Sequence, residues 1–78
     1  MEIKMKIGIR IKELREIQNL SQKDLSYSSD LDRSYIASVE NGKRNISIVN
    51  IEKIAKALDV TLKDFFNNGK FDNNSASS

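Results

Sequence analysis

The sequence predicts an all-α fold, a compact bundle of five short helices. Apolar residues recur along the chain at steps of three and four, which is the spacing of one helix face. Proline is absent and glycine occurs only three times, so the turn-rich pattern of all-β folds is missing. A chain of 78 residues is long enough for one small domain with a modest core.

The first predicted helix runs from about Lys4 to Gln18, and Asn19 ends it in a left-handed cap. One stripe of this helix carries four apolar residues that we expect to face the core: Ile7, Ile11, Leu14 and Ile17. The second predicted helix opens at Ser21, because "SQKD" has the order of a capping box, and it continues to about Ser28.

The third predicted helix is capped by Asp32, whose carboxylate suits the positive end of a helix. It ends at Asn41-Gly42, where Gly42 supplies the left-handed residue. The fourth helix starts at Ser47, and the fifth starts at Thr61 with a second capping-box pattern, "TLKD". The residues of the fourth helix that we expect to face inward are Ile48, Ile51, Ile54, Ala55 and Leu58.

The outward face of the third helix is unusual for a solvated surface. Only "SDL" joins the second and third helices, a connection that favours the crossed helix-turn-helix arrangement. The contact between these helices would use Leu25, Ser26, Ile36 and Val39. The face left outside would carry Arg33, Ser34, Tyr35 and Ser38. Guanidinium and hydroxyl groups at the N-terminal end of an exposed helix suit base edges and phosphates in a major groove.

The composition argues against an enzyme, a metal site or a cofactor. Cysteine and histidine are both absent, which removes the usual zinc ligands and the usual general base. The serines have no convincing base nearby, and the glycines form no phosphate-binding loop. No apolar run approaches the length of a membrane span, and the N-terminus lacks the apolar core of a signal peptide. We therefore expect a cytoplasmic protein with no membrane contact.

Three stretches of the chain resemble the Cro/CI-type helix-turn-helix family of bacterial and phage regulators, also called the xenobiotic-response-element family. They are "IKELREIQNLSQKDLS", "LDRSYIASVENGKRN" and "IEKIAKALDVTLKDFF", within roughly residues 7–66. The second stretch most resembles the controller proteins of restriction-modification systems, although phage-type repressors and antitoxins share most of the pattern. The resemblance implies a lambda-repressor-like DNA-binding domain over residues 1–68, followed by a polar tail over residues 69–78.

Two positions depart from the family's pattern. Asp30 stands where the turn usually has glycine, and aspartate tolerates the left-handed conformation better than most residues. Ser26 stands where alanine is more common, and we expect its hydroxyl to bond back to its own helix. Neither departure threatens the expected fold.

The resemblance also implies roles in DNA binding for particular residues. Base contacts would come from Arg33, Ser34 and Ser38, and a phosphate contact from Gln22. Tyr35 would pack on the DNA backbone or a flexible base step. Contacts with the sugar-phosphate backbone or the minor groove would come from Asn41, Lys43 and Arg44. Arg15 and Glu40 occupy positions that pair in this family. The structural alternatives are a surface-covering role for Tyr35 and a first-turn helix-forming role for Gln22.

Surplus apolar residues around the fifth helix predict a second copy of the chain as a partner. They are Ile46, Val49, Leu62 and Phe66. Adjacent helical residues cannot point the same way, so we expect Phe65 and Phe66 to divide between the core and a partner. A homodimer would read a palindrome in double-stranded DNA, with half-sites about one helical turn apart.

The predicted function is that of a sequence-specific transcriptional regulator. Placed over a promoter it would block RNA polymerase, and placed just upstream it could recruit it. The alternative from another class is a protein-interaction module in which the third helix faces solvent. That alternative does not explain the adjacent basic residues Lys43 and Arg44.

Overall fold

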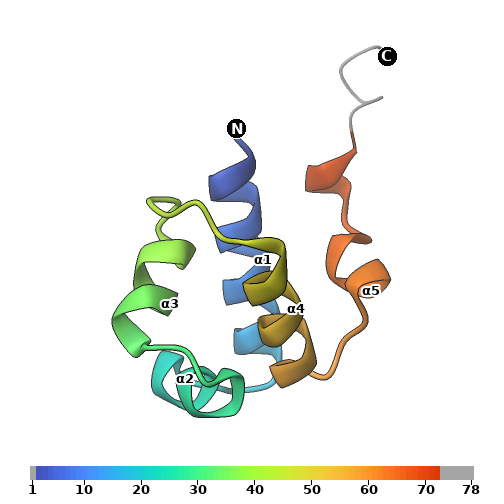
Figure 1. The fold of residues 1–78 in the computed structure, drawn as a ribbon. Helices are drawn as coiled ribbons and strands as arrows, with labels where there is room; N and C mark the ends of the chain where they lie inside the picture. Colours follow the sequence, from blue (N-terminus) through green and yellow to red (C-terminus); the bar gives the residue numbers. More distant parts are fainter. Residues whose placement is uncertain (1, 73–78) are drawn as a thin grey trace.

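A computed structural model describes residues 2–72. Within this range the chain forms five α-helices and a short 3-10 helix (Figure 1). They are α1 (Ile3–Ile17), α2 (Gln22–Ser29), α3 (Arg33–Glu40), α4 (Ile48–Ala57), α5 (Leu62–Phe66) and η1 (Gly69–Phe71). The described residues include no strand. The predicted all-α, five-helix fold is therefore confirmed.

The predicted caps of three helices are present in the structure. The Ser21 hydroxyl accepts a hydrogen bond from the Asp24 backbone N–H at 2.9 Å, and the Asp24 carboxylate accepts one from the Ser21 N–H at 2.9 Å. This reciprocal pair is the predicted capping box of α2. The hydroxyls of Ser47 and Thr61 likewise cap α4 and α5 by accepting hydrogen bonds from backbone N–H groups.

The predicted cap of α3 is wrong in one respect. Asp32 occupies the N-cap position with an extended backbone, but its side chain makes no capping hydrogen bond. The backbone of Asp32 (φ −63°, ψ 142°) differs from that of the three residues that do cap. Their ψ angles are 167° at Ser21, 157° at Ser47 and 162° at Thr61.

Left-handed residues end the helices where the sequence predicts them. Asn19 has a φ of 58° after α1, and Gly42 has a φ of 73° after α3. Asp30 also has a φ of 58°, so the turn keeps its geometry without the usual glycine. The Ser26 hydroxyl donates to the Lys23 carbonyl at 2.6 Å, which confirms the expected bond back to its own helix.

The core lies among all five helices and is almost entirely aliphatic. It consists of Ile7, Ile11, Leu14, Leu25, Ile36, Val39, Ile51, Ile54, Ala55, Leu58 and Phe65. Two residues predicted to be inside are in fact outside, because Ile17 and Ile48 are each 73% exposed. Both stand in a terminal turn of their helix. The helical period fixes the direction of a side chain, but not whether another element extends far enough to cover it.

Helix α3 packs on both α1 and α2, while α5 and η1 lie on the opposite side of the molecule (Figure 1). Gly8 allows a very close approach of α1 to the end of α3. A Cβ atom at Gly8 would lie only 2.4 Å from the Val39 carbonyl oxygen and 2.6 Å from that of Glu40. The two helices therefore meet backbone to backbone at this point.

The packed part of the chain continues beyond residue 68. The ring of Phe71 lies edge-on to Phe66, with centroids 5.1 Å apart. Lys70 donates to the Glu13 carboxylate at 2.9 Å, and Arg10 donates to the Phe65 carbonyl at 2.7 Å. These contacts fasten the C-terminal segment to α1. Residues 73–78 of the predicted polar tail lie outside the described residues, and the division at residue 68 stays a prediction.

Candidate nucleic-acid interface

The N-terminal half of α3 presents its polar side chains to solvent. Arg33 and Ser34 are exposed, and Ser38 is half-buried one turn later. On the opposite face of the helix, Ile36 is completely buried and Val39 is 1% exposed. The helix is thus anchored by one face, and the expected base-contacting residues lie on the remainder.

The loop that follows α3 adds further polar and basic side chains. Asn41, Lys43 and Arg44 are all exposed. The Lys43 backbone N–H donates to the Ser38 carbonyl at 3.0 Å, which folds the start of the loop against the helix end. The Arg44 guanidinium lies 5.0 Å from the centroid of the Tyr35 ring. The structure therefore places a cation of this loop against a residue of α3.

Tyr35 is less exposed than a purely outward residue would be. Its ring packs against the core cluster, and its hydroxyl accepts a hydrogen bond from the Asn50 side-chain Nδ2 at 3.0 Å. The structure therefore shows the surface-covering role that the sequence left open. Asn50 was not among the predicted site residues, because no sequence pattern in the first turn of α4 points to α3.

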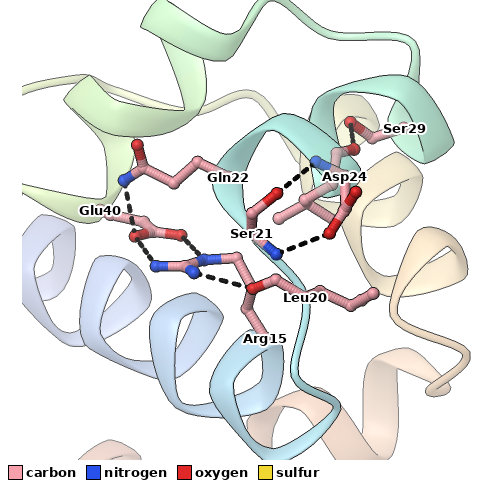
Figure 2. Close-up of polar contacts among 8 residues, drawn as sticks. Arg15, Leu20, Ser21, Gln22, Asp24, Ser29 and Glu40 are labelled. Atoms are coloured by element: carbon pink, nitrogen blue, oxygen red, sulfur yellow. Dashed lines mark hydrogen bonds and ion pairs between the residues drawn. The ribbon is translucent and has the colours of Figure 1, made fainter.

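Gln22, Arg15 and Glu40 form one hydrogen-bonded group, drawn in Figure 2. Arg15 donates to the two Glu40 carboxylate oxygens at 2.8 Å and 2.9 Å, and Gln22 Nε2 donates to the same carboxylate at 3.1 Å. Arg15 also donates to the Leu20 carbonyl at 2.9 Å. The group therefore ties α1, the start of α2 and the end of α3 together.

The Arg15–Glu40 ion pair, with an N–O distance of 2.8 Å, confirms the predicted pairing, and its two side chains are largely shielded from solvent. The side chains are only 11% and 3% exposed, respectively. The hydrogen bonds to Glu40 raise the pKa of the Arg15 guanidinium above its ordinary value. Gln22, predicted to contact a phosphate, is held by this pair at the edge of α2.

The predicted dimer residues divide into exposed and half-buried groups. Val49 is 58% exposed, and Ile48, which we expected in the core, stands beside it at the start of α4. Ile46, Leu62 and Phe66 are half-buried and pack against the core of their own chain. Leu62 also lines a pocket between α4 and α5, together with Glu52, Ala55, Lys56, Val60 and Thr61.

One of the two adjacent phenylalanines lies in the core as expected, and the contact of the other with a partner stays a prediction. Phe65 is completely buried, whereas Phe66 lies at the edge of the core, with its ring centroid 5.0 Å from that of Phe65. Its contact with Phe71 means that Phe66 already has an aromatic neighbour on each side within its own chain.

Residues 2–72 show neither a metal-binding cluster nor a membrane-spanning helix. This range contains no group of three histidine, cysteine, aspartate or glutamate side chains placed to hold a metal ion. None of its helices is long and apolar enough to cross a bilayer.

Comparison with known proteins places these features in context. The Helix-turn-helix family profile matches residues 11–65. Control protein C.MunI of a Mycoplasma species is 48% identical over 66 residues, which cover 83% of this chain and 89% of that protein. The crystal structure of the restriction-modification controller protein C.AhdI from Aeromonas hydrophila is similar with a TM-score of 0.78. The two are 49% identical, and the match covers 81% of this chain and 96% of that one.

A third similar structure is a complex with DNA. It is the restriction-modification controller protein C.Esp1396I, a tetramer bound to its natural 35 base-pair operator. Its TM-score is 0.81 at 38% identity, and the match covers 85% of this chain and 87% of that one.

Proposed function

The chain belongs to the helix-turn-helix family and to its restriction-modification controller proteins, and we propose that it regulates its own operon as a homodimer on palindromic DNA. The observation that carries this proposal is the exposed Arg33-Ser34 end of α3, on a helix whose other face is buried. The exposed Lys43-Arg44 loop lies beside it. We propose no catalytic role for the chain. We also propose that it acts in the cytoplasm, where the operon lies.

We assign base contacts to the outward residues of α3. An arginine at the first position of a recognition helix extends forward toward base edges, and its planar fork can bond two acceptors of one guanine. Arg33 has this position, and the short hydroxyls of Ser34 and Ser38 would serve the neighbouring bases. Tyr35 would meet the DNA backbone beside them.

Phosphate contacts are assigned to the residues that flank α3. Lys43, Arg44 and Asn41 would meet the backbone on one side, with Arg44 able to enter the minor groove. Gln22 would serve the other side, because its amide has two N–H groups and only one is committed to Glu40. The bond to Glu40 would therefore aim Gln22 without using up its capacity to bind a phosphate.

The dimer surface is proposed at the start of α4 and along α5. Val49 and Ile48 would form its exposed centre, and Ile46, Leu62 and Phe66 would border it. Two copies would fill a palindrome with half-sites about one helical turn apart. Because the similar C.Esp1396I occurs as a tetramer on its operator, we propose that two dimers fill adjacent sites. They would block or recruit RNA polymerase according to their position relative to the promoter.

The decisive experiment compares an operator with a scrambled duplex at one salt concentration. The operator is first selected by the wild-type protein from a pool of random duplexes. Arg33→Ala should cost about 1–3 kcal/mol per half-site on the operator and much less on the scrambled duplex. Arg33→Lys should keep the non-specific binding and recover little of the preference. Equal losses on both duplexes would instead make Arg33 a phosphate contact.

A matched variant in the loop separates charge from base recognition. Lys43→Ala should weaken binding to both duplexes and lower the slope of affinity against salt by about two units per dimer. Lys53→Ala removes the same charge from an exposed position of α4 and should leave both quantities nearly unchanged. A wild-type protein that selects no duplex at low salt would favour the interaction-module alternative.

Dimer formation is tested separately by sedimentation. Val49→Arg should weaken self-association and operator binding together while the helical content stays the same. Val49 is preferred to Phe66 for this test, because Phe66 also contacts Phe65 and Phe71 within its own chain. A wild-type chain that stays monomeric at tens of micromolar, alone and on the operator, would remove the dimer proposal.

A further inference from the structure

Tyr35 is held by side chains from two other parts of the chain. Its hydroxyl accepts the hydrogen bond from Asn50 Nδ2 at 3.0 Å, and the Arg44 guanidinium lies over its ring at 5.0 Å. The latter distance is within the range of a cation–π contact. A residue of α3, a residue of the following loop and a residue of α4 therefore meet at one point beside the proposed DNA surface.

Asn50 is itself fixed in place. It is the third residue of α4, and its backbone N–H donates to the capping hydroxyl of Ser47 at 3.1 Å. The residue is half-buried, so its side chain has limited freedom. The amide that reaches Tyr35 is thus supported by the first turn of a helix rather than by a free loop.

The direction of this hydrogen bond determines what the Tyr35 hydroxyl can do next. A phenol has one O–H donor and also accepts through its oxygen. Because the oxygen of Tyr35 accepts from Asn50, the O–H remains available to donate to another group. Phosphate oxygens and several base-edge atoms in the major groove are acceptors. Because the Asn50 amide donates to the phenol oxygen, the Tyr35 O–H can itself donate a hydrogen bond to an acceptor atom of DNA.

We propose that Asn50 is a positioning residue for DNA recognition, which holds the Tyr35 phenol, with Arg44 stacked on it, as a hydrogen-bond donor toward DNA. The inference rests on the proposed function, since it assigns Asn50 to the same surface. Asn50 acts through Tyr35 and need not touch the DNA itself.

The test is a double-mutant cycle measured on the selected operator. Tyr35→Phe and Asn50→Ala should each weaken operator binding by about 2–10-fold per half-site, the range expected for one hydrogen bond. The double variant should bind no more weakly than the weaker single variant, because Asn50 has nothing to position once the hydroxyl is gone. Losses that multiply in the double variant would show that the residues act independently and would overturn the inference.

A second variant tests the direction of the bond. Asn50→Asp replaces the amide donor with an acceptor, so the Tyr35 proton would turn inward, away from DNA. We expect Asn50→Asp to bind more weakly than Asn50→Ala. Part of that loss comes from the added negative charge, and this part persists in the Tyr35→Phe background. The effect of the proton direction is the difference between Asn50→Asp and Asn50→Ala with Tyr35 present, minus the same difference in the Tyr35→Phe background. A value of zero would overturn the inference.

Matched controls separate positioning from folding. Tyr27→Phe removes a hydroxyl from an exposed tyrosine of α2, and Asn67→Ala removes an amide from an exposed position after α5. Both should bind the operator like the wild type. Asn50→Ala should sediment like the wild type and unfold in the same single transition, with no more than the small loss of stability expected for one hydrogen bond. A loss of binding with unchanged folding and pairing then supports positioning.

The failures of the two proposals are distinguishable. A wild-type protein that selects no operator would overturn the proposed function and this inference together. A wild-type protein that binds its operator, with Asn50→Ala binding equally well, would overturn the inference alone.

Discussion

The two ends of α3 differ in how they are held. At the C-terminal end, the Glu40 side chain is 3% exposed and paired with Arg15, and Gly8 brings the backbone of α1 into contact. At the N-terminal end, Arg33 and Ser34 are exposed, and the Asp32 side chain makes no capping bond. The contacts with α1 therefore hold the C-terminal end of α3, whereas its N-terminal end is exposed to solvent. In the proposed function, the residues that stabilise α3 and those that would contact DNA therefore lie at different ends of the helix as well as on different faces.

The largest effect on stability should come from removing the ion pair between Arg15 and Glu40. Arg15→Met leaves the buried carboxylate without its cation, so the free energy of unfolding should fall by about 3–5 kcal/mol in urea titrations. The double variant Arg15→Met/Glu40→Leu removes both charges, and it should be more stable than Arg15→Met alone. A double variant that loses the sum of both single costs would show that Arg15 and Glu40 act independently, and would contradict their pairing.

A smaller loss is expected at the contact between α1 and α3. Gly8→Ala would force the carbonyl groups of Val39 and Glu40 away from the new methyl group. We expect a net loss of about 2 kcal/mol in thermal or urea unfolding, despite the helix propensity of alanine. Gly69→Ala is the matched control, because a Cβ atom there would meet nothing within 4 Å. Equal stability of the two variants would contradict a tight contact at Gly8.

The caps of α2 and α3 should respond differently to the same kind of change. Ser21→Ala removes a capping hydroxyl that accepts a 2.9 Å hydrogen bond, and should cost about 1 kcal/mol. Asp32→Ala removes no capping bond, and should cost about 0.5 kcal/mol or less, through the helix dipole alone. Urea midpoints of the two variants give the comparison directly. A loss for Asp32→Ala as large as that for Ser21→Ala would mean that the carboxylate caps α3 in solution.

The smallest effect concerns pH and is confined to the capped end of α2. The Ser21 backbone N–H, which donates to the Asp24 carboxylate, lowers the pKa of Asp24 below its ordinary value. A depressed pKa in the folded state adds stability above the pKa of the unfolded chain, and this stability is lost as pH falls through the folded value. The stability difference between wild type and Asp24→Asn should therefore be constant above about pH 5 and shrink below about pH 4. A difference that grows as the solution is acidified would contradict this assignment.

The sequence predicted those features that depend on neighbours close in the chain. Helical period and capping patterns correctly gave the five helices, the Ser21 capping box and the left-handed residues Asn19 and Gly42. The same period failed at Ile17 and Ile48, where exposure depends on how far distant helices extend. Local chemistry can assign a side chain to a face, but the tertiary fold decides whether that face is covered.

The candidate site was predictable in its residue types and less so in its connections. Arg33, Ser34, Lys43 and Arg44 are exposed, as a surface for DNA requires. The link from Asn50 to Tyr35 was not predictable, because a single hydrogen bond joins two residues that lie 15 positions apart in the chain, on different helices. No repeat or motif marks such a bond, so only the three-dimensional structure can reveal it.

The exposed pair Ile48-Val49 has an evolutionary consequence. These side chains belong to α4, whereas Arg33 and Ser34 lie on α3, so the residues that would select a partner are separate from those that would select a sequence. A duplicated gene could diverge at Arg33 and Ser34 while its product kept the ancestral pairing surface. The two products would then exchange subunits, and the hybrid would favour asymmetric sites, with one half from each parent. To prevent two such regulators from exchanging subunits within one cell, changes at α4 would be required as well as at α3.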